Sequence, residues 1–184
     1  LRPFPEVREL IVTRLVNERA DQLSTTLQRR VASMFSSDYR AYSDALLQKQ
    51  PVPASSVGPA FNTYDYLKAL AGKIEQDTGV RVNVTTFGDR AVDAERLARE
   101  PGVGAAEGTP SGMNRAVPLA AFVVQRAKPL LDARAGGKRQ TVTTPALELF
   151  EPTPWFTNPD GTAYITRVTA AQPSRVPQFA EVEA

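Results

Sequence analysis

The fold is decided by residues 5–48, which read PEVRELIVTRLVNERADQLSTTLQRRVASMFSSDYRAYSDALLQ. No proline lies between Glu6 and Gln50. The apolar side chains recur at steps of three, four or, across one gap, eight, so they share one face of a helix. They are Val12, Val16, Ala20, Leu23, Leu27, Val31, Met34 and Tyr42. Pro5 suits the first turn of a helix, and Glu9 complements the positive end of its dipole.

The length of this helix raises the question of what covers it. A straight helix of about 30 residues would be about 45 Å long, more than the diameter of a small domain. Part of it should therefore protrude or pack against another element. The run Ser36-Ser37-Asp38 would also allow a break, with Ser or Asp capping a second helix over 38–48. One interpretation is a long core helix. The other is an arm whose exposed apolar stripe binds partners or unfolded chains.

After the helix, residues 51–62 are rich in proline and are typical of a linker. A second helix should start near Tyr64 and end at Gly79, because glycine commonly terminates helices. The alternation of Val80, Val82 and Val84 with polar residues predicts a half-buried strand over 80–85.

The remaining segments suggest short elements. We predict a short helix over 91–100, a loop over 101–112 and a helix after Pro118, and two strands over 141–150 and 162–169 joined by a long hairpin loop. Asp160-Gly161 is the turn signal in that loop.

These segments predict an α+β fold: a long N-terminal helical arm and a small antiparallel sheet covered by helices. The expected parts are a helical arm (1–50), a linker (51–62), an α+β domain (63–171) and a connector into a following helix (172–184). Because the chain starts at Leu1, we expect it to be a piece of a longer protein.

Composition excludes several classes of function. The chain contains no histidine and no cysteine, which removes the usual general base, thiol nucleophiles, soft metal ligands and disulfides. The net charge is +2 with both signs interspersed, too weak a field to argue for nucleic acid or an anionic membrane. No run of eighteen apolar residues predicts a membrane span. We expect no cofactor and no metal site.

Three motifs carry a resemblance to a known family. They are Ala120-Ala121-Phe122-Val123-Val124, the strand Asp160-Gly161-Thr162-Ala163-Tyr164-Ile165-Thr166-Arg167-Val168, and the segment Pro173–Val182 that follows it. They resemble the parvulin-like modules of SurA/PpiD-type periplasmic peptidyl-prolyl isomerases and chaperones. The resemblance implies a parvulin-like domain, a bacterial periplasmic or envelope location and a membrane-anchored parent protein.

The chain departs from that family where catalysis would take place. Active parvulins carry paired histidines in their pocket, and no histidine stands at any position here. The resemblance therefore implies a non-catalytic module that binds polypeptides or a partner protein, as a chaperone or scaffold. Two alternatives stay open: an active isomerase that uses an apolar aromatic pocket, and a purely structural spacer.

Aromatic side chains are the candidate binding residues. Trp155 and Phe156, in the proline-rich hairpin loop, could stack on a polypeptide, or they could fold back onto the sheet. Phe35, Tyr39 and Tyr42 could form a second apolar surface near the linker, or pack in the core. The expected partners are an unfolded or nascent polypeptide or a partner protein, with no nucleic acid and no direct membrane contact. A homodimer through the helical arm is also open.

Overall fold

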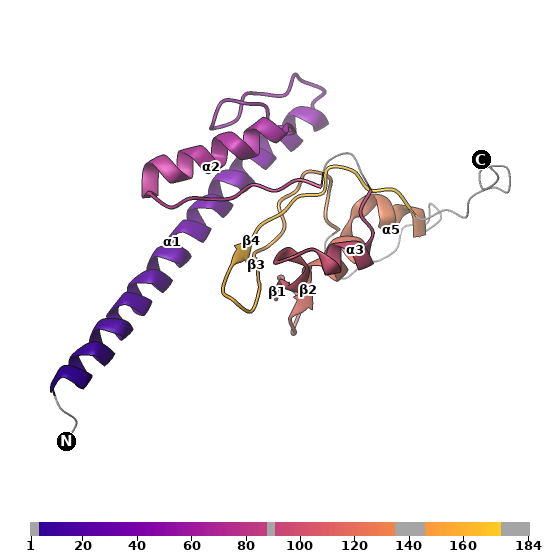
Figure 1. Ribbon diagram of the computed structural model, residues 1–184. Helices are drawn as coiled ribbons and strands as arrows, with labels where there is room; N and C mark the ends of the chain where they lie inside the picture. Colours follow the sequence, from indigo (N-terminus) through magenta and orange to yellow (C-terminus); the bar gives the residue numbers. More distant parts are fainter. Residues whose placement is uncertain (1–3, 88–90, 135–145, 174–184) are drawn as a thin grey trace.

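The computed structural model describes residues 4–87, 91–134 and 146–173. Its longest element is α1 (Phe4–Leu47), a single uninterrupted helix of 44 residues. At 1.5 Å per residue it is about 66 Å long. Figure 1 shows its N-terminal half extending away from all other elements. The alternative of a break at residues 36–38 is wrong, because Asp38 is buried and accepts hydrogen bonds from Ser56 rather than capping a helix.

The second helix, α2 (Tyr64–Thr78), packs along the C-terminal half of α1 (Figure 1). Its ends are those that the sequence predicts. The Thr63 side chain accepts a hydrogen bond from the backbone of Tyr66, and Gly79 ends the helix with a φ of 70°. The two helices run antiparallel, since Tyr66 lies beside Asp38 while Asp77 lies beside Arg30.

A first core forms between these two helices. Its buried residues are Val31, Phe35, Tyr42, Phe61, Tyr66, Leu70 and Ile74. The first core includes four residues of the apolar stripe that the sequence predicts on α1: Leu27, Val31, Met34 and Tyr42. The rest of that stripe (Val12, Val16, Ala20 and Leu23) is exposed. The stripe is therefore covered only in its second half.

The proline-rich segment after α1 belongs to this core. Phe61 is 1% exposed, and Val52 and Val57 pack against the same cluster. A bridge pairs Ala54 with Ala60, so the segment closes on itself as a loop between the two helices. Residues 51–62 thus connect α1 and α2 as an ordered part of the first core, not as a spacer between two units.

The rest of the chain builds a second layer of short elements (Figure 1). In chain order they are α3 (Ala94–Arg99), the 3₁₀ turn η1 (Val103–Ala105), β1 (Glu107–Gly108), β2 (Val117–Pro118), α4 (Leu119–Arg126), α5 (Lys128–Arg134), β3 (Phe156–Thr157) and β4 (Ala163–Tyr164). The four strands form an antiparallel sheet in the order β2-β1-β3-β4. A second core lies against it, with buried Ala106, Leu119, Phe122, Leu147 and Phe156.

Two predicted strands are absent from the described residues. The segment 80–85 is irregular, although Val82 and Val84 are more buried than their polar neighbours, because no strand among the described residues pairs with it. In the segment 141–150, residues 141–145 lie outside the described residues, and Leu147 forms only a bridge to Ala127.

The predicted hairpin exists, but a different segment forms its first arm. The partner of 162–169 is 150–158, which the sequence suggested was mostly loop. Backbone hydrogen bonds join Phe150 to Val168, Thr153 to Thr166 and Asn158 to Thr162. The turn lies at Asp160-Gly161 as predicted, with Gly161 at a φ of 87°. Prolines at 152, 154 and 159 limit regular pairing, since proline donates no ladder hydrogen bond.

The two arms of this hairpin stand between the two cores. Side chains alternate from one face of a strand to the other. Trp155 and Ile165 accordingly pack against the first core, while Phe156 and Tyr164 pack in the second. The hairpin therefore fixes the second layer to the helix pair.

As the sequence predicts, the architecture is a mixed α and β fold with a long N-terminal helix and a small antiparallel sheet, which has four strands. No helix of the described residues is long and apolar enough to cross a membrane. The predicted connector lies outside the described residues from residue 174 on.

Because Phe61 lies at the centre of the first core, we predict that Phe61→Ala lowers the free energy of unfolding by about 3–5 kcal/mol. Urea unfolding followed by circular dichroism measures this change. Phe87→Ala is the matched control, since Phe87 is 39% exposed and should shift the midpoint little. A small effect of Phe61→Ala would contradict the assignment of residues 51–62 to the core.

Candidate interaction surface

The five aromatic residues predicted as binding residues contribute to the two cores. Phe35, Tyr42 and Phe156 are buried, at 1%, 7% and 0% exposed. Tyr39 and Trp155 are partly buried against the first core. The structure brings four of the five to one cluster and places Phe156 in the other. Their role in binding stays a prediction, and a ligand could reach Phe35 or Phe156 only if the domain opened.

The aromatic packing is centred on Phe61. Its ring centroid lies 5.6 Å from that of Phe35, 5.5 Å from that of Tyr42 and 4.8 Å from that of Tyr66. These separations, with tilted or edge-on planes, are typical of favourable aromatic pairs. The space around Phe61 is therefore filled by aromatic side chains of this chain.

A buried polar network lies beneath these rings. The Asp38 carboxylate accepts hydrogen bonds from the Ser56 backbone at 2.8 Å, the Ser56 hydroxyl at 2.7 Å and the Tyr66 hydroxyl at 3.0 Å. Burial, followed by the charge of Asp38 and the hydrogen bond to it, raises the pKa of Tyr66 well above its ordinary value. Burial, followed by the charges of Glu151 and Glu148, raises the pKa of Tyr39 to about 12. These phenols are thus held neutral in the fold.

Arg167 connects this core to the hairpin. Its guanidinium donates to the carbonyl oxygen of Phe61 and, at 2.7 Å, to that of Thr63. The same group lies over the rings of Phe61 at 5.3 Å and Phe150 at 5.6 Å. Burial lowers the pKa of Arg167, and its electrostatic interactions with Tyr66 and Tyr42 oppose that change. Arg167 has a structural role, since carbonyls and rings surround it.

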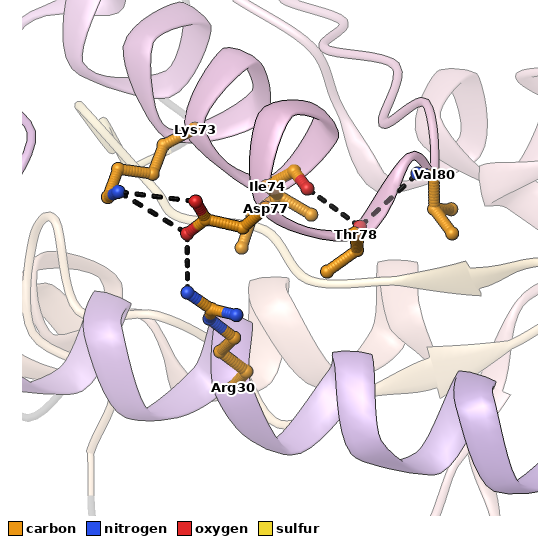
Figure 2. A network of polar contacts seen from close by, with 6 residues as sticks. All are labelled: Arg30, Lys73, Ile74, Asp77, Thr78 and Val80. Carbon is orange, nitrogen blue, oxygen red and sulfur yellow. Dashed lines mark hydrogen bonds and ion pairs between the residues drawn. The ribbon is translucent and has the colours of Figure 1, made fainter.

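An ion-pair network marks the point where the cover of α1 ends. Figure 2 shows Asp77, in the last turn of α2, between Arg30 of α1 and Lys73 of α2. The Lys73 ammonium lies 3.3 Å from the Asp77 carboxylate. The next residue, Thr78, donates to the carbonyl of Ile74 at 2.7 Å as the helix ends. Toward the N-terminus from this network, Leu27 is the last side chain of α1 that packs against the first core, and residues 7–26 are exposed.

The arm, which we define as residues 7–26 of α1, is the candidate interaction surface. Every one of its side chains is exposed. Seven of the twelve exposed large apolar side chains among the described residues lie on it, so the exposed apolar area is concentrated here. They are Val7, Leu10, Ile11, Val12, Leu15, Val16 and Leu23, between 36% and 60% exposed. Concentrated exposed apolar side chains are typical of protein interaction sites.

The apolar side of the arm faces a different direction from the core-facing side of the same helix. The residues Val31, Phe35, Asp38 and Tyr42 follow steps of four, three and four. Continuing those steps toward the N-terminus reaches five polar residues, Gln28, Ser24, Asp21, Asn17 and Arg14, before it reaches the apolar Leu10 and Val7. An α-helix turns by about 100° per residue. The group Ile11, Val12, Leu15 and Val16 is therefore centred about 140° around the helix axis from the core-facing residues. A partner of the arm would therefore approach mostly from a different side from α2, with overlap only at Val16, which lies in line with Met34 of the first core.

The exposure of the arm depends on where α2 ends, which the sequence of α1 does not show. The sequence pattern predicts the arm as one of two interpretations of α1. That pattern does not include Ile11 and Leu15, because they fall outside the face that leads into the core. The sequence does contain a sign of the exposed surface, since four large apolar residues occur within six positions, 11–16. No cluster of acidic residues in the described parts of the chain is arranged to hold a metal ion.

No family of known proteins, no curated protein and no solved structure matches this chain.

We predict a loss of stability at high pH that depends on Tyr66. The folded protein holds the phenol proton more tightly than the unfolded chain, so this contribution is complete below pH 10.0 and is lost as the pH rises above it. Tyr66→Phe should lower the free energy of unfolding by about 1 kcal/mol at pH 7, through loss of the bond to Asp38. It should also make the decline above pH 10.0 shallower.

Urea unfolding between pH 7 and about pH 11.5 measures both effects. Tyr64→Phe is the control, since Tyr64 is 39% exposed on α2. An equally steep decline with Tyr66→Phe would show that Tyr66 does not cause it.

The arm should contribute little to the stability of the domain. We predict that Leu15→Ala combined with Val16→Ala changes the free energy of unfolding by less than about 0.5 kcal/mol, because both side chains are exposed. Val31→Ala, on the buried part of the same helix, should cost about 2 kcal/mol. Parallel urea titrations test the contrast. An effect of the arm variant as large as that of Val31→Ala would mean that the arm is covered in solution.

Proposed function

We propose that this chain is a non-catalytic module that binds polypeptides or a partner protein through its arm, as a chaperone-like or scaffold part of a bacterial envelope folding factor. The observation that carries the proposal is the arm itself: a helix about 30 Å long whose side chains are all exposed and of which one side is apolar. The envelope location, the membrane-anchored parent and the parvulin-like character of the domain rest on the resemblance of residues 120–124, 160–168 and 173–182.

Two properties of the arm support binding rather than spacing. A spacer needs no apolar surface, yet the arm carries large aliphatic side chains in every turn from Val7 to Val16. Most of the stability of a helix in a protein comes from tertiary packing. Because the arm has no such packing in the described part of this chain, contact with another molecule would stabilise it. The rest of the surface gives less support for a binding site, since most of the aromatic side chains pack in the two cores.

The isomerase alternative has weaker support. It requires an apolar pocket able to hold a prolyl peptide, and the aromatic residues that would line it pack against one another around Phe61. The chain also has no histidine for the paired positions of active parvulins.

An aggregation assay tests the proposal directly. The wild-type protein should suppress aggregation of a chemically unfolded client enzyme. Leu15→Asp combined with Val16→Asp should lose that effect, because charged groups replace the apolar contact. Thr13→Asp combined with Asn17→Asp is the matched control, since it adds the same charge to the polar side of the arm. Light scattering of the client follows the result.

A proline-limited refolding assay on the same proteins separates the alternatives. The proposal predicts no acceleration of the slow refolding phase. Acceleration would favour the isomerase. Neither suppression nor acceleration would favour the spacer. Suppression that survives the two arm substitutions to Asp would place the binding surface elsewhere and contradict the role of the arm.

A further inference from the structure

The apolar side of the arm has a defined charge at each end. Ile11, Val12, Leu15 and Val16 cover two helical turns and are 51–60% exposed. Arg8 and Arg19 flank them on the same side, because their eleven-residue separation is about three helical turns. We call these six residues the arm patch. Its two guanidinium-bearing residues stand about 17 Å apart along the helix axis.

The two arginines are available to a partner. In the described part of the chain neither Arg8 nor Arg19 forms an ion pair, whereas Arg14, on another side of the helix, pairs with Glu18 at 2.8 Å. No acidic residue lies on the centre line of the patch, since Glu9 and Glu18 are each about 90° round the helix from it and border the patch beside Val16 and Ile11. Along its centre line the patch is therefore apolar in the middle and positive at both ends.

This pattern disfavours a second copy of the arm as the occupant. An antiparallel pair centred on the patch would match Ile11 with the other Val16 and Val12 with the other Leu15. It would also place Arg8 opposite the other Arg19 at both ends, and a parallel pair would place each arginine opposite its own copy. Like charges in these positions oppose association. A shift by one heptad would instead set Arg19 against Leu15 at the centre of the interface.

We propose that the occupant of the arm patch is an amphipathic helix of a partner protein that presents an apolar stripe with a carboxylate at each end. This inference rests on the proposed function and adds the chemistry of the partner to it. Two aligned helices would bury the four apolar side chains in ridge-and-groove contact. A glutamate or aspartate at each end of the partner's stripe would lie near Arg8 and Arg19. The charges would then fix the register of the two helices, and the apolar contact would supply most of the affinity.

A charge-exchange experiment tests this inference. The probe is a fluorescent helical peptide of about 18 residues with leucines on one face and glutamate at both ends of that face. A matched peptide carries lysine in place of those glutamates. Fluorescence anisotropy measures the binding of each to the full chain and to the variant with Arg8→Glu and Arg19→Glu. Arg29→Glu with Arg40→Glu is the control, because both are exposed arginines of α1 outside the patch.

The wild-type chain should bind the glutamate peptide about tenfold more tightly than the lysine peptide, and the Arg8/Arg19 variant should reverse that preference. The control variant should behave like the wild type, and the preference should weaken in high salt. Equal binding of both peptides would overturn the inference. So would a dimer of the wild-type chain in sedimentation that the Leu15→Asp and Val16→Asp pair dissolves, or patch-dependent binding to anionic phosphatidylserine vesicles without peptide selectivity.

The two experiments distinguish a failure of this inference from a failure of the proposed function. If the wild-type chain suppresses client aggregation through the arm but shows no charge preference, the proposed function stands and the partner chemistry is wrong. If it does neither, both fail.

Discussion

The packing of Phe61 is the interaction on which the rest of the structure depends. This ring contacts aromatic side chains from both long helices and lies under the guanidinium of Arg167. It thereby joins three segments that are far apart in the sequence: α1, α2 and the C-terminal hairpin. Aromatic rings bury a large area and carry directional contacts, so one residue at such a junction fixes the position of several elements. The backbone carbonyl of Phe61 adds a polar contact by accepting a hydrogen bond from Arg167.

The same junction decides which part of α1 is buried. The segment after α1 turns back at once, and α2 then runs antiparallel along the helix for only 15 residues. Cover of α1 therefore ends within about one turn of the Arg30–Asp77 ion pair, and the side chains of residues 7–26 are exposed. The arm is a geometric consequence of the unequal lengths of two paired helices, 44 residues against 15. Its apolar patch is a separate property, because it is centred on a different side of α1 from the core-facing residues, although Val16 at its edge lies in line with Met34 of the first core.

Much of the local structure could be predicted from the chain. The long helix, the Thr63 and Gly79 ends of α2 and the turn at Asp160-Gly161 depend on local capping, periodicity and backbone preferences. The errors fall where pairing or packing is non-local. The valines at 80–84 alternate as in a strand but have no ladder partner, and the proline-rich loop after residue 150 pairs in a hairpin despite its prolines. Phe61 was in a segment whose composition is typical of a linker, and composition does not show what a single aromatic side chain contacts.

The candidate site likewise has properties that local sequence predicts and properties that depend on packing. The residue types and their spacing were enough to predict that α1 is a long helix with an apolar stripe and that histidine chemistry is absent, but they left a covered helix and an exposed arm as alternatives. Which of these residues are buried depends on tertiary packing. Val31 and Val16 have the same chemistry and lie on the same predicted stripe, yet one is 5% exposed and the other 60%. Likewise Phe35 and Phe156, which the sequence offered for binding, lie within the cores. Burial depends on which elements from elsewhere in the chain pack against a side chain, and a local sequence pattern does not show those contacts.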